Sequence, residues 1–275
     1  MPIQKTIFLK TYQQAINFTA NYYLILGLFS LVLMITPQKT TAQCNPDEWI
    51  EGWYDWAKGW QNYALDQFPI TDAEEMACGD TMHLAVTKDY QLIPLAQHPK
   101  GGVLQQILQN LAQYKQRKGI NYTLYIIKDD KTLNAFSIAG GRIYITTRMI
   151  NYANTLDELA FVIAHEIAHV EQKHAARKIQ TIIASRYYLA ENGDFGAAIA
   201  NALTSPFGQI DEYQADRAGA DLVIAAGYDA RKGLDFFERM ATTERYDSIE
   251  KMVRTHPYSA ERYACLHDYL NQKGK

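Results

Sequence analysis

The 275-residue chain is long enough for one domain of moderate size or two small ones, and 48% of its residues are hydrophobic, which excludes a wholly disordered protein. Its net charge of −3 gives no electrostatic footprint for nucleic acid, and the sequence has no basic arm and no base-stacking motif. We therefore expect no nucleic-acid partner.

The first 42 residues have the composition of a targeting segment. Lys5 and Lys10 precede an apolar run of 14 residues, from Tyr22 to Ile35, and small residues follow up to Ala42. A membrane span needs about 20 apolar residues, so this run suits the core of a signal peptide better. We predict a signal peptide over residues 1–42, and hence an exported, periplasmic or secreted protein. An uncleaved anchor, which would associate the chain with a membrane, is the alternative.

Residues 43–100 form an aromatic-rich N-terminal segment. Its most regular feature is a stripe of tryptophans at helical spacing, comprising Trp49, Trp53, Trp56 and Trp60. We interpret this stripe as packing on the main domain, with a carbohydrate or membrane surface as the alternative. Proline and glycine residues between positions 94 and 102 mark a boundary. The main domain is accordingly assigned to residues 101–275.

The three cysteines, Cys44, Cys78 and Cys265, form no CxxC pair, so neither a thiolate metal site nor a redox dithiol is indicated. Export would place them in an oxidising compartment. We predict a Cys44–Cys78 disulfide, because both cysteines precede the main domain. Cys265 falls on an apolar helix and is predicted to be a buried thiol.

The main domain is predicted to be α+β, mainly helical, with a small sheet. The expected helices cover residues 103–119, 155–180, 211–226, 230–242 and 260–271, and the expected strands cover 122–127 and 142–146. Thr155 and Glu158 form a capping box at the start of the 155–180 helix.

The strongest chemical signal is the HEIAH motif at residues 165–169. His165 and His169 are four residues apart, so they share one face of a helix and can reach one zinc ion. Zinc lowers the pKa of water to about 7, and the carboxylate of Glu166 could take its proton as it attacks a carbonyl. A chance match on a surface helix is the alternative. Burying two histidines and a glutamate in the run AFVIAHEIAHV is, however, costly unless a metal binds them.

A catalytic zinc needs a third protein ligand and one open position. His174 lies five residues after His169, outside the metzincin spacing, and is interpreted as a solvated helix residue. Glu212 is the better candidate, because Asp216 follows four residues later on the same helical face and could orient a ligand histidine. From the residues alone, an acidic and solvated helix start is an equal alternative.

Four ordered segments resemble the gluzincin metallopeptidases of the HtpX, Oma and CAAX prenyl protease type, with the soluble, exported BepA-like members nearest in kind. The segments are NAFSIAGGRIYIT (134–146), HEIAH (165–169), EYQAD (212–216) and HPYSAER (256–262). The resemblance implies a zincin-like metallopeptidase domain whose active-site helix carries HExxH. It also implies one Zn²⁺ per chain, with His165, His169 and Glu212 as ligands and Glu166 as general base. Asp216 would orient one of the ligand histidines without binding the metal itself.

The same resemblance places His256 and Arg262 near the catalytic centre. Pro257 disfavours helical geometry at His256, so we expect this residue in a loop ahead of the last helix. There it could donate to the oxyanion, or it could act as a fourth ligand that holds the enzyme latent. Arg262 could support either state by pairing with a carboxylate. A plain helix cap at His256 is the structural alternative.

The segment before the second expected strand offers candidate substrate-binding residues, namely Asn134, Ala135, Phe136, Gly140 and Gly141. The two glycines let the backbone turn tightly beside an edge strand. An edge strand presents N–H and C=O groups to an extended peptide. An ordinary hairpin is the alternative.

These observations together predict a zinc-dependent endopeptidase that takes protein or peptide substrates outside the cytoplasm. The resemblance alone implies that these substrates are exported or envelope proteins and that the enzyme has a role in their quality control. One alternative is a chaperone or assembly factor that retains the fold and a latent zinc site. Another is an adhesin-like binding module that uses the tryptophan stripe. Intact His165, Glu166, His169 and Glu212 favour the enzyme over both alternatives.

Overall fold

The computed structural model of the chain describes residues 66, 69–189, 207–243, 256 and 260–274. The chain divides into two units, residues 1–41 and 42–275, and all of the described residues belong to the second. The predicted signal peptide and the tryptophan stripe lie outside the described residues. Among the helices that are described, none combines the length and the apolar character required to cross a membrane.

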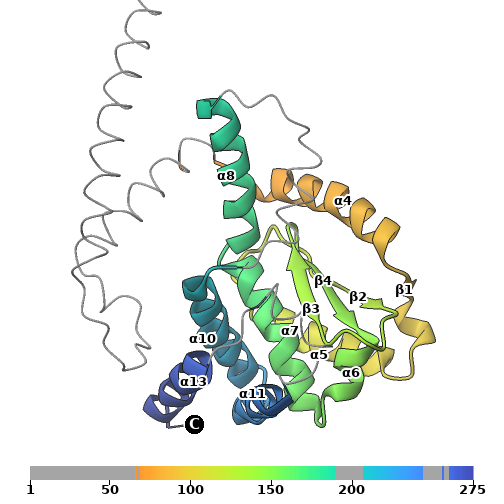
Figure 1. Cartoon of the computed structure of the whole chain (residues 1–275), viewed down its shortest axis with the longest axis vertical. Coiled ribbons are helices and arrows are strands. Elements are labelled where there is room, and N and C mark those ends of the chain that lie inside the picture. Colours follow the sequence, from red (N-terminus) through yellow and green to blue (C-terminus); the bar gives the residue numbers. More distant parts are fainter. Residues whose placement is uncertain (1–65, 67–68, 190–206, 244–255, 257–259, 275) are drawn as a thin grey trace, which may run out of the picture. The chain divides into compact units, whose positions relative to one another are not determined.

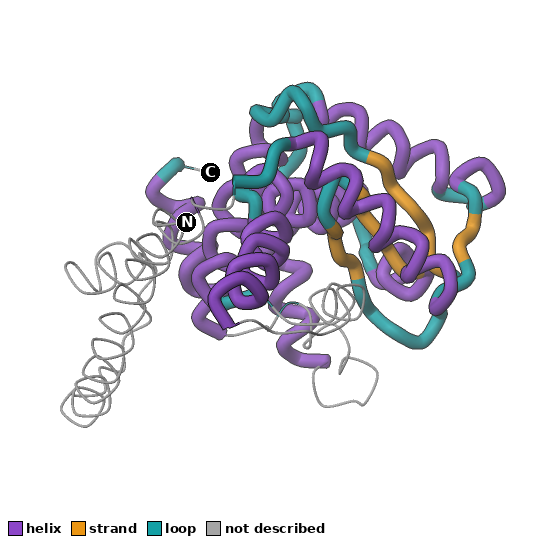
Figure 2. The backbone as a smooth tube through the Cα atoms, turned by 90° about the horizontal axis from the view of Figure 1, so that it is seen from above, coloured by secondary structure: helices purple, strands orange, loops and turns teal. Residues whose placement is uncertain are grey.

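A four-stranded mixed sheet organises the described part, with helices on both sides of it (Figures 1 and 2). The strands are β1 (Leu92–Ile93), β2 (Thr123–Ile127), β3 (Ala135–Ile138) and β4 (Arg142–Thr146), in the spatial order β1-β2-β4-β3. The central pair β2 and β4 is parallel, with Ile126 opposite Ile145, and the outer pairs are antiparallel. β3 therefore forms one edge of this sheet.

The helices bear out the predicted α+β class, in which a mainly helical domain carries a small sheet. The described helices are α4 (Asp72–Asp89), η1 (Leu95–Gln97), α5 (Gly101–Ala112), α6 (Thr147–Tyr152), α7 (Leu156–Glu171), α8 (His174–Leu189), α10 (Gln209–Ala225), α11 (Arg231–Thr243) and α13 (Ala260–Gln272). Helix α5 ends at Ala112 rather than near Gly119, and α4 and α6 had no counterpart among the predicted elements. Both α4 and β1 precede Gly101, yet β1 is a strand of the sheet and α4 packs against that sheet.

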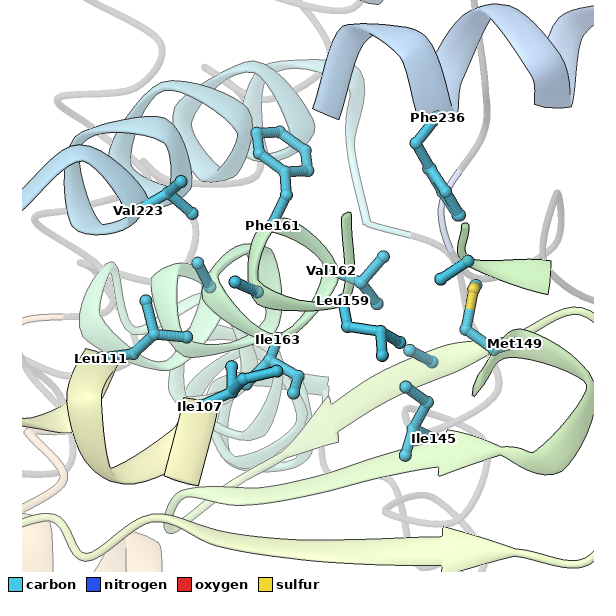
Figure 3. Packing of buried hydrophobic residues seen from close by; sticks show 14 of the residues in the cluster. Ile107, Leu111, Ile145, Met149, Leu159, Phe161, Val162, Ile163, Val223 and Phe236 are labelled. Carbon is cyan, nitrogen blue, oxygen red and sulfur yellow. The ribbon is translucent and has the colours of Figure 1, made fainter. Parts of the chain in front are cut away.

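Side chains alternate between the two faces of the sheet, and each face is apolar. Ile143 and Ile145 of β4 join the larger core cluster with α5 and α7, whereas Tyr144 between them joins a smaller cluster with α4. Figure 3 shows the larger cluster, in which Ile145 of the sheet lies beneath residues of α7 such as Ile163. The sheet thus supports α7 from below.

Helix α7 carries the HEIAH motif and is buried from Glu158 to Val170. Helix α10 packs closely along it, because Gly219 lies where a Cβ atom would come within 3.1 Å of the His165 backbone nitrogen. This close approach brings the acidic first half of α10 against the two motif histidines.

The N-terminus of α7 is capped as predicted, but the box closes differently. The Glu158 N–H donates to Thr155 Oγ1 at 3.2 Å. The Glu158 carboxylate accepts from the Asn154 N–H at 2.8 Å rather than from Thr155 itself, and it also pairs with Arg239 at 2.6 Å.

The single helix predicted over residues 155–180 is wrong, because the structure has two helices with a break at Lys173. This residue has φ of 60°, a left-handed conformation that non-glycine residues rarely adopt. Its N–H donates to the Val170 carbonyl at 3.0 Å, and its own carbonyl accepts from Arg177 at 2.9 Å. The conformation of Lys173 therefore separates α7 from α8.

The cysteines do not follow the prediction. Cys78 on α4 is a free thiol, which rules out its pairing with Cys44, and Cys265 on α13 is disulfide-bonded rather than a free buried thiol. Cys44 lies outside the described residues. A disulfide requires Cα atoms about 6 Å apart, and this proximity depends on the tertiary fold rather than on sequence position.

Candidate metal centre and active site

Four buried side chains converge at one point beside α7, and their ligand-type atoms all lie within 4.8 Å of one another. They are His165, His169, Glu212 and His256. The Nε2 atoms of His165 and His169 are 3.0 Å apart. The Glu212 carboxylate lies 3.5 Å from the first of these nitrogens and 3.4 Å from the second.

Each motif histidine has a separate partner for its outer nitrogen. His165 Nδ1 lies 3.0 Å from Asp216 Oδ1, and His169 Nδ1 lies 2.8 Å from His174 Nδ1. With protons on both Nδ1 atoms, the two Nε2 lone pairs face each other and the Glu212 carboxylate. Such groups repel one another unless a cation lies between them. Two imidazole nitrogens and one carboxylate are a donor set that zinc accepts.

Four buried atoms at this point make no hydrogen bond within the described part of the chain, namely His165 Nδ1, Glu166 Oε2, Glu212 Oε2 and His256 Nε2. Buried polar atoms in native proteins are nearly always satisfied by protein, ordered water or an ion. Their presence beside the converging ligands therefore fits a site that binds a metal together with polar reactants.

Arg262 of α13 holds the acidic residues of α10 in place. It donates to the Asp216 carboxylate from Nε at 2.8 Å and from Nη2 at 2.6 Å, and its Nη1 lies 2.7 Å from Glu212 Oε2. Burial opposes the charge of the guanidinium, but Asp216 and Glu212 outweigh burial and hold the pKa of Arg262 above its usual value. Burial would likewise raise the pKa of Glu212, but the charges of Arg262 and His256 hold it well below the usual value.

The surroundings of the two motif histidines shift their pKa values in opposite directions. Burial lowers the pKa of His165, but Asp216 and Glu212 outweigh it and raise that pKa to about 9. Burial holds the pKa of His169 well below its usual value. The surroundings of His165 thus favour positive charge where its Nε2 meets the other ligand atoms, as a metal site requires.

His256 precedes α13, outside any helix, and its ring enters the ligand cluster. Its Nδ1 lies 3.0 Å from Glu212 Oε1 and 3.3 Å from His165 Nε2, and its Nε2 lies 3.4 Å from Glu166 Oε1. The ring therefore lies between the ligands and the carboxylate of Glu166.

An apolar pocket opens beside Glu166. Its lining combines the polar residues His165, Glu166, His256 and Arg262 with the apolar residues Ala135, Met149, Phe161, Val162, Phe236 and Phe237. Figure 3 shows Val162 of α7 below Phe236 of α11. The Phe161 ring meets that of Phe237 edge to face, with 5.6 Å between centroids. The pocket thus connects the converging polar groups to a surface that suits an apolar side chain.

The predicted substrate-binding residues do not gather at one place in the structure. Ala135, at the start of β3, lines the pocket with His165 and Glu166. Phe136 faces the opposite side of the sheet, where its ring stacks on Tyr144 at 4.9 Å. Gly140 and Gly141 form the β3–β4 hairpin turn with φ of 76° and 81°.

The backbone groups of this segment are held within the fold at two points. The Gly140 N–H donates to Glu75 of α4 at 3.2 Å, which anchors the turn away from the pocket. Both backbone groups of Asn134 bond to Thr146. The Asn134 carbonyl accepts from the Thr146 N–H at 3.0 Å, and the Asn134 N–H donates to the side-chain Oγ1 of Thr146 at 3.2 Å.

His174, predicted to be a solvated helix residue, is only 2% exposed. Burial lowers its pKa to about 4, and its Nε2 lies 3.2 Å from Gln214 Oε1. The prediction failed because it assumed a continuous helix, on which residues five apart point in directions about 140° different. Sequence reasoning also missed Phe207, whose ring stacks on His169 at 4.0 Å between centroids.

Comparisons with known proteins agree with this geometry. A beta-barrel assembly-enhancing protease of Yersinia pestis is 28% identical over 170 residues, which cover 55% of this chain and 35% of that protein. The protein of the same name from Escherichia coli is 29% identical over the same shares. The mitochondrial metalloendopeptidase OMA1 of Schizosaccharomyces pombe is 26% identical over 182 residues, 63% of this chain and 54% of that protein.

The match thus spans about a third of the length of the bacterial relatives and about half of the fission-yeast one. The model of peptidase family M48 matches residues 100–270, which include every residue of the ligand cluster and most of the sheet. With an intact His-His-Glu site in the expected place, the chain belongs to peptidase family M48, a family of metalloendopeptidases.

Proposed function

We propose that the protein is a zinc-dependent endopeptidase that binds one zinc ion per chain through His165, His169 and Glu212. The observation that carries this proposal is the convergence of two imidazole Nε2 atoms, 3.0 Å apart, on one buried carboxylate. Bound zinc would supply Lewis-acid activation of water and of the scissile carbonyl.

The chain itself supplies the proton transfers. Glu166 lies beside the ligands, and its buried Oε2 makes no hydrogen bond among the described residues, so it is free to accept a proton from the attacking water. The same carboxyl group can then return that proton to the leaving amine. Arg262 holds Asp216, and Asp216 in turn fixes the ring of His165.

The position of the edge strand indicates how a polypeptide would bind. β3 is an edge of the sheet, and Ala135 at its start also lines the pocket beside Glu166. We infer that an extended substrate pairs with this edge and inserts an apolar side chain between Phe161, Phe236 and the neighbouring residues of the pocket.

We further propose that the substrates are exported or envelope proteins and that the enzyme serves in their quality control. The apolar run before residue 42 supports export, with membrane association if that segment is retained. The names of the bacterial relatives tie those proteins to the assembly of beta-barrel proteins. The present chain spans only about a third of the length of those proteins.

The proposal is tested by proteolysis of casein. The purified chain should cleave casein, lose this activity when a chelator removes the metal, and regain it when zinc is restored. Elemental analysis should give about one zinc per chain, since the described ligands form one cluster.

The control for this test is the His165→Ala variant, which lacks a ligand of the cluster. It should bind zinc much more weakly than the wild type and should not cleave casein, because the cluster then lacks one of its two motif histidines. Cleavage that survives the chelator, or full zinc occupancy in His165→Ala, would contradict the proposal.

We propose that His256 acts as a fourth ligand and holds the site latent. The support is that its Nδ1 enters the ligand cluster, 3.0 Å from Glu212 Oε1, while its ring stands between the ligands and Glu166. A catalytic zinc keeps one position open for water, and a fourth protein ligand fills it, so removing His256 should open the site. We expect His256→Ala to raise basal casein cleavage by about tenfold or more, as a preference of about 1.4 kcal/mol or more for the closed site would give, while zinc content stays near one per chain.

The matched control is His267→Ala, because His267 is an exposed histidine on α13 away from the cluster. It should leave cleavage unchanged. A fall in kcat of about 10²-fold in His256→Ala would instead identify His256 as an oxyanion donor and reject the latent state.

A further inference from the structure

His174, the first residue of α8, contacts the candidate metal ligand His169 although no step of the proposed chemistry uses it. The Nδ1 atoms of the two rings are 2.8 Å apart, and His174 Nε2 lies 3.2 Å from the side-chain oxygen of Gln214 on α10. All three side chains are buried or half-buried.

The proton positions along this contact follow from the chemistry of the ligand. His169 can bind a metal through Nε2 only when its proton is on Nδ1. That proton is then donated to His174 Nδ1, so His174 must carry its own proton on Nε2. The Nε2–H group donates in turn to Gln214 Oε1, which is a carbonyl oxygen and accepts. Each group in this series of hydrogen bonds can therefore act as the donor or acceptor that its neighbour requires, and none of them has to carry a charge.

The backbone is bent to make this contact. On a continuous helix, residues 169 and 174 would point about 140° apart and could not touch. The break at Lys173, with φ of 60°, turns His174 back toward His169. A conformation so uncommon for a lysine persists when the surrounding structure determines it, and such residues cluster at functional sites.

A face of the His169 ring is also covered. Phe207 stacks on it at 4.0 Å with an interplanar angle of 21°. His169 is thus held at its outer nitrogen by His174 and on its face by Phe207. By contrast, the partner of His165 is the carboxylate of Asp216.

We propose that His174 is a positioning residue that, together with Gln214, fixes the tautomer and orientation of His169 for zinc binding. This inference rests on the proposed function, since it takes zinc as the ion that His169 binds. Partners behind a ligand typically change metal affinity by about 10–100-fold when they are removed.

The test is the zinc affinity of the full chain, measured by competition with a chromophoric chelator. We expect His174→Ala to weaken zinc binding by about 10–100-fold and to alter the visible absorption spectrum of the cobalt-substituted protein. His174→Asn places an oxygen near the former Nδ1 position, so its affinity should lie closer to wild type than to His174→Ala. Gln214→Leu, which removes the last acceptor of the chain, should weaken binding in the same direction but less.

Two controls separate this role from a general effect on the fold. His267→Ala removes an exposed histidine from α13, and Lys173→Gly retains the left-handed turn with a residue that adopts it freely. Both should keep the wild-type affinity and cobalt spectrum. Circular dichroism establishes that each variant is folded, and if His174→Ala does not fold, His174→Asn and Gln214→Leu decide the question.

Unchanged zinc affinity and an unchanged cobalt spectrum in folded His174→Ala would overturn the inference, as would an equal loss in His174→Ala and His174→Asn. Unchanged zinc affinity in Gln214→Leu would show that Gln214 takes no part in positioning His169. The proposed function fails separately, since a protein that binds zinc but does not cleave casein, either as the wild type or as His256→Ala, would contradict it and leave the positioning role of His174 intact.

Discussion

Glu166→Gln should retain zinc and the native fold while losing hydrolysis by about 10²-fold or more, since this is the usual contribution of a general base. The glutamine has nearly the same shape, and Glu166 Oε2 makes no hydrogen bond that the substitution would break among the described residues. A glutamine side chain cannot accept the proton of the attacking water. The measurement is casein cleavage at matched zinc content.

The matched control is Glu238→Gln, because Glu238 is an exposed glutamate on α11. It should cleave casein at the wild-type rate. Near-normal turnover by Glu166→Gln would remove this residue from the mechanism. Because the variant should still bind substrates, it is also the form with which to trap natural substrates in cells.

The ligand cluster could be predicted because it depends on local spacing within two helices. Residues four apart share a helical face, which joins His165 to His169 and Glu212 to Asp216 whatever the tertiary fold. How α7 and α10 meet could not be read from the residues alone. It depends on Gly219, whose missing side chain allows the close approach, since a Cβ atom there would lie only 3.1 Å from the His165 backbone nitrogen. The match of four ordered segments to a known family supplied that step.

The errors arise where tertiary contacts override local signals. Lys173 is not a glycine, so nothing in the sequence marks the left-handed break between α7 and α8. The cysteine pairing failed because it was inferred from sequence position, although the pairing depends on distance in the fold. Strand β3 has only four residues, and it was hidden within a segment assigned to substrate binding.

Arg262→Met should destabilise the metal-free protein by about 3–5 kcal/mol, because it leaves the carboxylates of Asp216 and Glu212 buried without their positive partner. Arg262→Lys should have an intermediate effect, since a lysine keeps the charge but cannot make the paired contacts of the guanidinium. Urea unfolding of the metal-free chain measures both. Arg231→Met, which removes an exposed arginine from α11, is the control and should change stability little.

The pH dependence of the unfolding free energy tests whether Arg262 acts through its charge. In the wild type, burial would raise the pKa of Asp216, but Arg262 and His165 outweigh it and lower that pKa. A carboxylate with a lowered pKa stabilises the fold above its unfolded pKa of about 3.9, and this contribution is lost as the pH falls through the folded value. The stability gap between wild type and Arg262→Met should therefore narrow in acid, where protonated Asp216 and Glu212 no longer need a cation. A gap that stays constant down to low pH would mean that Arg262 contributes through its packing on Phe237 rather than through its charge.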